Sequence, residues 1–375
     1  MPPPLLLFVV TEDWYFCSHR LPLARAAKAA GFRVAVATRV QDHRERILAE
    51  GFELHEIPAL QRGLGGWREP RTLLALIQLY RRLRPAAAVH VALKPVVIAG
   101  LAARIAGPPP ILNIMTGFGF LFTSRSLKAA LLRRPITAVL RAVIDRPGST
   151  TIVQNDEDRE LLFQAVPGAV SRSALVRGSG VDCERFTPLP EPAGPFTAAA
   201  VCRMLGDKGV RDLVEAGRLL RRRGQACRIL LVGPTDPLNP TAIPERELRA
   251  WTKEGVVEWL GPREDVKEVW RMAHAAVLPS HREGLPKALI EAAACGRPII
   301  ATDTTGCKEV VEHGKNGLLV PLRDPSALAD ALQALARDPE GRRRMGAAGR
   351  LRVEERYAEG VVVSQSLELI ERLVG

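Results

Sequence analysis

Short apolar runs alternate with helical patterns along the whole chain, and this alternation restricts its fold more than any other feature. An apolar run over 5–10 precedes a predicted loop over 11–18, a predicted helix over 19–30 that Gly31 ends, and a second apolar run over 32–38. A strand, a helix and a strand in this order predict a βαβ unit, whose two strands pair in parallel. The sequence therefore predicts an α/β protein built on parallel sheets.

The same alternation continues beyond this opening. Further strands are predicted over 52–57, 86–93, 111–115, 149–153, 174–177, 197–203, 228–233, 256–261, 275–279, 299–303 and 316–320. Helices are predicted over 43–50, 70–84, 94–106, 155–165, 208–224, 265–273, from 286 onward, over 325–337 and over 342–374. A chain of 375 residues is too long for one ordinary core, so two domains are expected. Four prolines between residues 188 and 195 suit a stiff linker between them.

The basic residues of the chain are concentrated in its first half. The net charge is +12, of which residues 1–175 carry +10 and residues 176–375 carry +2. This surplus predicts an anionic partner for the first half: a membrane, a phospholipid, a polyphosphate or a nucleic acid. Nucleic acid is disfavoured because only 5% of residues are aromatic and no nucleic-acid-binding module is recognisable.

The cysteines and the N-terminal segment bear on the compartment. The six cysteines form no C-x-x-C pair, which favours a reduced, cytoplasmic chain without structural zinc. The apolar run over 5–10 is too short for a signal peptide or a membrane span, so a buried first strand is expected there.

One stretch, residues 278–298, combines an anion site with two acids. A helix predicted to begin at Pro286 would leave the amides of Gly284, Leu285 and Lys287 near its N-terminus, where spare N–H groups and the helix dipole attract anions. Glu283 lies at the mouth of this site and Glu291 lies inside the helix. Carboxylates accept hydrogen bonds from hydroxyl groups, so the stretch suits a ligand with phosphates and hydroxyls. The alternative is a plain strand, loop and helix with a surface Glu.

The pattern S-x-x-E-G-L-P-x-x-x-x-E-A-x-A-x-G-x-P in this stretch resembles the signature of family 4 retaining glycosyltransferases of the GT-B fold. The resemblance implies two facing Rossmann-like domains with an interdomain cleft, over residues 1–176 and 177–357. It also implies a last helix, over 358–375, that crosses back onto the first domain. In that family the first Glu, here Glu283, contacts the donor sugar, and the second, here Glu291, contacts the ribose of the nucleotide.

Two further elements resemble donor-binding parts of this family. Arg203, followed after four residues by Lys208 and Gly209, resembles the element that holds the donor diphosphate. Trp259 and Leu260 resemble the segment that holds the nucleobase. Two fixed cations would neutralise a leaving diphosphate, where charge grows in the transition state. We therefore expect Arg203, Lys208 and Glu283 to be catalytic and no metal or other cofactor to be needed.

Asp156 and Asp158 allow a different interpretation, the D-x-D metal motif of the other large glycosyltransferase fold. We reject it because Asn155 is a good N-cap and acids in the first turn complement the helix dipole. Helix capping explains these residues without a metal.

Several candidate acceptor residues follow predicted strands of the first half, where a parallel sheet gathers its ligand-binding loops. They are His19, Arg20, Lys94, Thr116, Gly117 and Gly119. Local packing of His19 and a plain turn at the glycines are the alternatives. The surrounding pieces FCSHRLPLA, LKPVVIAGLAA and TGFGFLF resemble the subgroup of family 4 enzymes that builds capsule, O-antigen and protein-glycan precursors on lipid carriers.

Residues 122–146 are both basic and apolar, and Pro135 is expected to divide them. Such a segment can lie in an anionic membrane interface, with arginine among the headgroups and leucine below. The alternative is a pair of ordinary surface helices. The basic residues proposed to meet the membrane are Arg125, Lys128, Arg133, Arg134 and Arg141.

Together these features predict a metal-independent, retaining hexosyl- or N-acetylhexosaminyltransferase. The expected donor is a UDP-sugar and the expected acceptor is a polyprenyl-diphosphate-linked glycan, met at the inner face of the cell membrane by a cytoplasmic, peripheral protein. Two alternatives remain: another GT-B enzyme, such as a nucleotide-sugar epimerase or a phosphorylase, and a non-catalytic membrane-associated protein that binds sugar nucleotides. The presence of Arg203, Lys208 and both acids argues against them.

Overall fold

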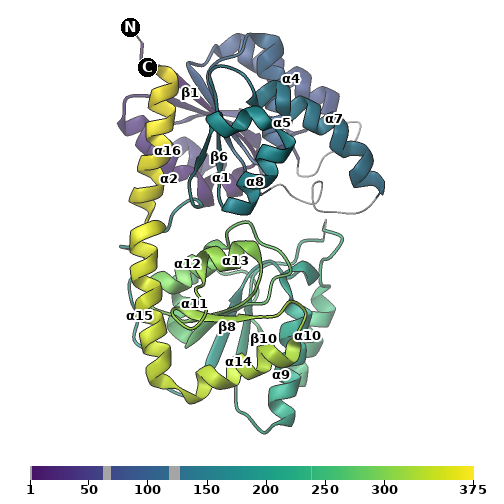
Figure 1. Ribbon diagram of the computed structural model, residues 1–375, viewed down its shortest axis with the longest axis vertical. Helices are drawn as coiled ribbons and strands as arrows, with labels where there is room; N and C mark the ends of the chain where they lie inside the picture. The colour runs from purple at the N-terminus through teal and green to yellow at the C-terminus, as the bar shows by residue number, and fades with distance from the viewer. Residues whose placement is uncertain (1, 62–68, 118–126, 238) are drawn as a thin grey trace. The chain divides into compact units, whose positions relative to one another are not determined.

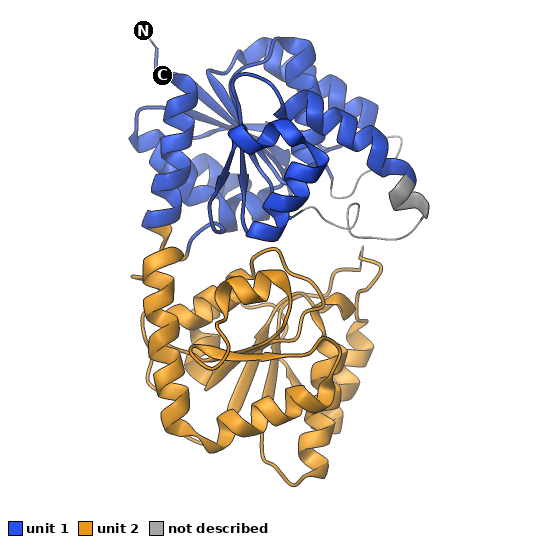
Figure 2. Cartoon of the chain, in the orientation of Figure 1, with its two compact units in different colours: residues 1–180, 360–375 blue, residues 181–359 orange. Residues whose placement is uncertain are grey.

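The computed structural model describes residues 2–61, 69–117, 127–237 and 239–375, with the backbone alone for residues 127–130. The chain forms two compact units, residues 1–180 with 360–375, and residues 181–359 (Figure 2). The domain limits proposed from the sequence, at 176 and 358, lie close to these divisions. Each unit is described by itself below.

The first unit is built on a seven-stranded parallel sheet in the order β3-β2-β1-β4-β5-β6-β7. Its interior strand β1 contains an unbroken apolar run that is buried on both faces, as is typical of strands in parallel sheets. The strands are β1 (Leu5–Glu12), β2 (Arg33–Arg39), β3 (Glu53–Glu56), β4 (Ala87–Val91), β5 (Ile111–Ile114), β6 (Ser149–Val153) and β7 (Ser173–Leu175).

Helices cover both faces of this sheet. One face packs against α4 (Glu69–Leu83), α5 (Leu93–Ala106), α7 (Leu127–Ile144), α8 (Asp156–Ala165) and the short η1 (Pro167–Arg172). The other face packs against α1 (Asp13–His19), α2 (Leu21–Ala29), α3 (Arg44–Ala49) and α16 (Glu359–Val374). In α16, Val362 and Ile370 join the same core as Phe16 and Leu21. The last helix therefore completes the unit that the first strand begins (Figure 1).

The second unit repeats this plan with a six-stranded parallel sheet in the order β10-β9-β8-β11-β12-β13. Its strands are β8 (Thr197–Val201), β9 (Arg228–Val232), β10 (Glu258–Trp259), β11 (Ala275–Leu278), β12 (Ile299–Thr302) and β13 (Gly317–Val320). One face packs against α9 (Val210–Arg222), α10 (Glu245–Glu254) and α14 (Pro325–Arg337). The other packs against α11 (Val266–Met272), α12 (Lys287–Ala294), α13 (Thr305–Val310) and α15 (Pro339–Arg356).

The predicted loop over residues 11–18 is wrong. Strand β1 continues to Glu12, and residues 13–19 form α1. The buried Asp13 begins this helix: its carboxylate accepts hydrogen bonds from the amides of Trp14 (2.7 Å), Gln41 (2.7 Å) and His43 (2.9 Å). The start of α1 is thus fixed by the loop that follows β2, a contact that the local sequence does not reveal.

The predicted division at Pro135 is also wrong, because α7 runs through it from Leu127 to Ile144. A proline inside a helix lacks one backbone hydrogen bond. Ile136, Leu140 and Ile144 lie on the buried face of this helix, and their packing against the core offsets the missing hydrogen bond. Helix stability in proteins comes mainly from such an apolar face.

No helix in the described part of the chain is both long and apolar enough to cross a membrane.

Candidate functional site

The strand order of the second unit points to one place for a ligand. Strands β9 and β10 follow on one side of β8, and β11, β12 and β13 follow on the other, so the direction of winding reverses between β8 and β11. Ligands of open parallel sheets bind at the carboxyl edge beside such a reversal. The loops there are those after β8, which carries Arg203 and Lys208, and after β11, which carries Glu283.

Lys208 and Glu283 meet at this point. The Lys208 Nζ lies 2.5 Å from the Glu283 Oε1, and the two side chains are only 20% and 10% exposed. The sequence predicts that Lys208 opens a helix, but it ends the short 3-10 turn η2 (Gly206–Lys208), and α9 begins at Val210. Gly209 separates the two, with a left-handed φ of 67°. This turn aims Lys208 at the neighbouring loop rather than along α9.

Arg203 has a partner that the sequence analysis missed. Its Nη1 donates to the Oδ2 of Asp236, 2.5 Å away, in the loop that follows β9. Asp236 follows β9, the strand next to β8, and so lies at the same edge of the sheet as Arg203. An acid just after a predicted neighbouring strand is the sequence signal that could have identified it. Both cations assigned to a diphosphate are thus paired with carboxylates in this structure.

Helix α12 presents its N-terminus beside Glu283. Pro286, predicted as its first residue, is instead the N-cap with an extended backbone, and Lys287 is the first residue. The Pro286 carbonyl accepts from the amide of Leu289 at 3.1 Å. The half-buried Gly284 and Leu285 lead directly into this helix end.

Glu291 lies in α12 with 13% of its side chain exposed. Burial raises the pKa of its carboxyl, while nearby Lys287 and Arg185 act in the opposite direction. The Lys287 Nζ is 3.8 Å from its Oε1. A sheltered carboxylate of this kind can accept hydrogen bonds from ligand hydroxyl groups with little competition from water.

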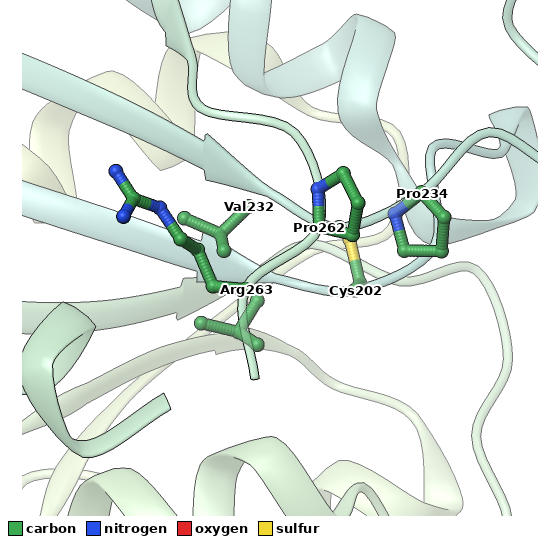
Figure 3. Close-up of a pocket in the computed structure, with 7 residues that line it drawn as sticks. Cys202, Val232, Pro234, Pro262 and Arg263 are labelled. Atoms are coloured by element: carbon green, nitrogen blue, oxygen red, sulfur yellow. The ribbon is translucent and has the colours of Figure 1, made fainter. Parts of the chain in front are cut away.

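A hollow of about 150 Å³ lies along the same sheet edge, beyond strands β8, β9 and β10 (Figure 3). Trp259 and Leu260 do not line it. The indole of Trp259 donates to the carbonyl of the lining residue Gly233 at 3.1 Å, and the Leu260 amide donates to the carbonyl of Leu231, which precedes the lining residue Val232, at 3.0 Å. The lining residues are Val201, Cys202, Val232, Gly233, Pro234, Pro262 and Arg263.

The candidate acceptor residues belong to the first unit, where the winding reverses between β1 and β4. His19 and Arg20 follow β1, at the end of α1, and Lys94 follows β4, in the first turn of α5. Thr116 and Gly117 follow β5, and Gly119 lies outside the described residues. The structure therefore places the described candidates after β1 and the two strands that follow it across the sheet, β4 and β5.

Three of these acceptor candidates have defined surroundings. The His19 ring stacks on Tyr15, with centroids 4.2 Å apart. The Lys94 Nζ pairs with the Glu69 Oε1 at 2.9 Å. Arg20 is only 3% exposed, and its Nε and Nη2 have no hydrogen-bond partner among the described residues. A buried guanidinium in this condition suits an anionic ligand group.

The residues proposed to meet a membrane are on or before α7. Arg125 lies outside the described residues, and Lys128 is on the helix without a described side chain. Arg134 and Arg141 are exposed, and Arg133 is half-buried. Leu131, on the same helix, is 78% exposed.

The predicted helix cap at Asn155 is confirmed. Its side-chain oxygen accepts from the Asp158 amide at 2.7 Å, and its amide nitrogen donates to the Asp158 carboxylate at 2.9 Å. Asp156 pairs with Arg159 at 2.6 Å. Across the described ranges, the structure contains no group of three His, Cys, Asp or Glu side chains placed to hold a metal.

Comparison with solved structures identifies the architecture. Sucrose-phosphate synthase from Thermosynechococcus elongatus matches with a TM-score of 0.81 and 21% identity over 99% of both chains. Anabaena HepE in complex with UDP-glucose matches with a TM-score of 0.78 and 18% identity over 98% of this chain and 100% of that one. These matches show the fold, and two parallel α/β domains of this kind define the GT-B class.

Family models and curated relatives then give the family. Residues 6–145 match the model described as glycosyl transferase 4-like, and residues 195–338 match that described as glycosyl transferases group 1. The chain belongs to the family 4-like glycosyltransferases of the GT-B fold.

Three relatives illustrate the range of this similarity. The provisionally named glycosyltransferase EpsD of Bacillus subtilis is 28% identical over 97% of this chain and 95% of its own length. N,N'-diacetylbacillosaminyl-diphospho-undecaprenol alpha-1,3-N-acetylgalactosaminyltransferase of Campylobacter jejuni is 24% identical, over 73% of each chain. The provisionally named colanic acid biosynthesis glycosyltransferase WcaL of Escherichia coli is 34% identical over 55% of this chain, and the match spans about half of that relative, 53%.

Proposed function

We propose that this glycosyltransferase transfers a sugar from a UDP-sugar to a polyprenyl-diphosphate-linked glycan during the synthesis of a surface polysaccharide or glycan, with retention of the anomeric configuration. The observation that carries the proposal is the Lys208–Glu283 pair at the winding reversal of the second unit. The name of the Campylobacter relative, which acts on a diphospho-undecaprenol substrate, supports the acceptor class. The UDP-glucose complex of HepE, which shares the fold, supports the donor.

The proposed mechanism begins with an exchange of partners. A bound diphosphate offers anionic oxygens to Lys208 and Arg203 in place of the carboxylates of Glu283 and Asp236. Glu283 is then released to accept hydrogen bonds from the sugar hydroxyls, next to the bond that breaks. As that bond breaks, negative charge moves onto the diphosphate, where the two cations and the α12 N-terminus stabilise it. We assign no nucleophile.

No metal is required in this proposal, because fixed cations supply the electrostatic stabilisation. His19, Arg20, Lys94, Thr116, Gly117 and Gly119 are proposed to bind the acceptor. The buried guanidinium of Arg20 supports this assignment, since a polyprenyl diphosphate carries anionic oxygens that could accept from its Nε and Nη2, which have no hydrogen-bond partner among the described residues.

The experiment that tests the proposed function is a transfer assay with a panel of UDP- and GDP-sugars and a polyprenyl-diphosphate-linked acceptor, run with and without EDTA. We expect transfer from one UDP-sugar, with retained configuration in the product and unchanged rate in EDTA. Binding of sugar nucleotides without any transfer would favour the non-catalytic alternative. Activity that is lost in EDTA and restored by Mn²⁺ would contradict metal independence.

Replacing Glu291 with alanine should weaken nucleotide binding. The change removes the proposed acceptor for a ribose hydroxyl, and a hydrogen bond to a charged group contributes roughly 1.5–3 kcal/mol, so a loss of about 10- to 150-fold is expected. Calorimetric titration with UDP measures it. Glu291→Gln keeps the size of the side chain, and its UDP affinity should fall between those of the wild-type chain and Glu291→Ala. An unchanged UDP affinity in Glu291→Ala would remove this residue from the site.

We further propose that α7 contacts the anionic inner face of the cell membrane. Changing Arg133, Arg134 and Arg141 together to serine should weaken binding to phosphatidylserine vesicles, since each basic residue near such a surface contributes about 1 kcal/mol. Co-sedimentation with the vesicles measures the change. Transfer to a short, water-soluble acceptor should survive.

The matched control for this triple variant changes three exposed arginines of the second unit, Arg222, Arg343 and Arg344, to serine. The net charge falls by the same amount, but vesicle binding should change little. Equal losses in the two variants would mean that the basic surplus acts only as general surface charge.

A further inference from the structure

The loop that carries Glu283 is tied to the segment that carries Lys208 by a second side chain, His281. The His281 amide donates to the Asp207 carbonyl at 2.8 Å. Its Nε2 lies 2.7 Å from the Oδ2 of Asp212. Ser280 adds a bond from its hydroxyl to the same Asp207 carbonyl at 3.1 Å. The two loops are therefore joined through Asp207 and Asp212 as well as through Lys208.

The His281–Asp212 contact is sheltered and well placed. The two side chains are 21% and 22% exposed, so water competes only partly for the bond. Asp212 lies in the first turn of α9, where a carboxylate also complements the helix dipole. The neutral imidazole with its proton on Nε2 and the charged imidazolium both donate to this carboxylate. Asp212 thus anchors the loop to a long, packed helix.

Donor binding affects the two contacts between side chains of these loops, Lys208–Glu283 and His281–Asp212, differently. In the proposed function, Lys208 turns to the diphosphate and Glu283 turns to the sugar, so their ion pair opens. The His281–Asp212 bond involves neither side chain and can persist. Together with the bonds from the His281 amide and the Ser280 hydroxyl to the Asp207 carbonyl, it can hold Glu283 near Lys208 at the moment of reaction.

We propose that His281 and Asp212 are positioning residues for sugar transfer, which keep Glu283 and Lys208 in register once the donor has opened their ion pair. The inference rests on the proposed function; His281 stands at an unspecified position of the S-x-x-E motif, and Asp212 lies outside the quoted motifs. It predicts a specific kinetic pattern. Misplacing a reacting group by about 1 Å can cost on the order of 100-fold in rate. The proposed diphosphate contacts of Lys208, Arg203 and the α12 N-terminus remain when His281 or Asp212 is changed, so UDP affinity should change little.

His281→Ala should therefore lower kcat about 10- to 100-fold and change UDP affinity less than about threefold. His281→Gln carries an amide NH₂ that can donate to Asp212, so it should recover most of the loss. Asp212→Asn keeps an acceptor oxygen and should also be mild, whereas Asp212→Ala should resemble His281→Ala. The matched control is His313→Ala, which removes a histidine whose Nδ1 accepts from the amide of Leu319 in β13, the edge strand two places from β11.

A measurement that does not depend on turnover completes the test. Deuterium exchange in peptides covering residues 279–286 should become faster in His281→Ala, return in His281→Gln and stay unchanged in His313→Ala. If exchange over 279–286 is the same in His281→Ala and the wild-type chain, or if glutamine restores nothing, the proposal is overturned. A failure of the proposed function would show instead as absence of transfer in the wild-type chain. The exchange result would still decide whether the His281–Asp212 contact holds the loop over residues 279–286.

Discussion

Replacing Lys208 with alanine should lower kcat about 100- to 1,000-fold, the range for losing one preorganised donor to a developing negative charge. Lys208 pairs with Glu283 in the structure and is proposed to turn to the donor diphosphate. Its contribution should be greatest in the transition state, when the bond to the sugar breaks, and such interactions raise the rate of the chemical step more than they tighten binding. The measurement is kcat at saturating donor, with donor KM determined alongside.

Two companion variants sharpen this prediction. Lys208→Arg should recover little of the loss, because a planar guanidinium offers a different donor geometry from an ammonium. Arg203→Ala should follow the same pattern as Lys208→Ala, since both cations are proposed to serve the same leaving group. Thermal melting checks that each variant is folded. A near-normal kcat with only a raised KM would reduce Lys208 and Arg203 to residues that bind donor and transition state equally.

Gly209→Ala should have the second largest effect, on both stability and turnover. Gly209 has a φ of 67°, and a Cβ there would lie 1.9 Å from the Pro279 carbonyl oxygen, on the loop that carries Glu283. The left-handed backbone costs about 1–2 kcal/mol for alanine, and overpacking adds about 1–3 kcal/mol. The melting temperature should fall by about 5–15 °C, and kcat should fall because the two loops are forced apart.

Gly255→Ala is the matched control for this change. Gly255 has a similar φ of 77°, but a Cβ there would meet nothing within 4 Å. It should show the backbone cost alone, with normal kcat. If Gly209→Ala and Gly255→Ala have the same melting temperature and the same kcat, the close approach of the two loops contributes to neither stability nor turnover.

Much of the fold could be predicted because several of its interior strands are buried on both faces. Strands β1, β11 and β12 contain continuous apolar runs, and their places in the chain follow from composition and spacing alone. Helix α1 could not be predicted, because its start depends on hydrogen bonds that the amides of Gln41 and His43 donate to the Asp13 carboxylate. These residues meet only after the sheet has formed.

The candidate site divides in the same way. The motif resemblance marks Arg203, Lys208, Glu283 and Glu291, and the structure places the first three on the loops beside one winding reversal. The partners Asp236 and Asp212 were missed. Each is an acid in an ordinary polar segment, and only the sheet order brings it to its cation or histidine. A single sequence records side chains, but pairings across loops depend on the topology.

Because α16 completes the core of the first unit, that unit cannot finish folding when its own 180 N-terminal residues have been synthesised. Val362 and Ile370 are still to be translated, and at the usual 5–20 residues per second the delay is about 10–40 s. The second unit, by contrast, is one continuous segment from 181 to 359. During translation it can reach its final structure first, while the face of the N-terminal sheet that α16 covers stays open to chaperones, or to aggregation, until the last helix leaves the ribosome.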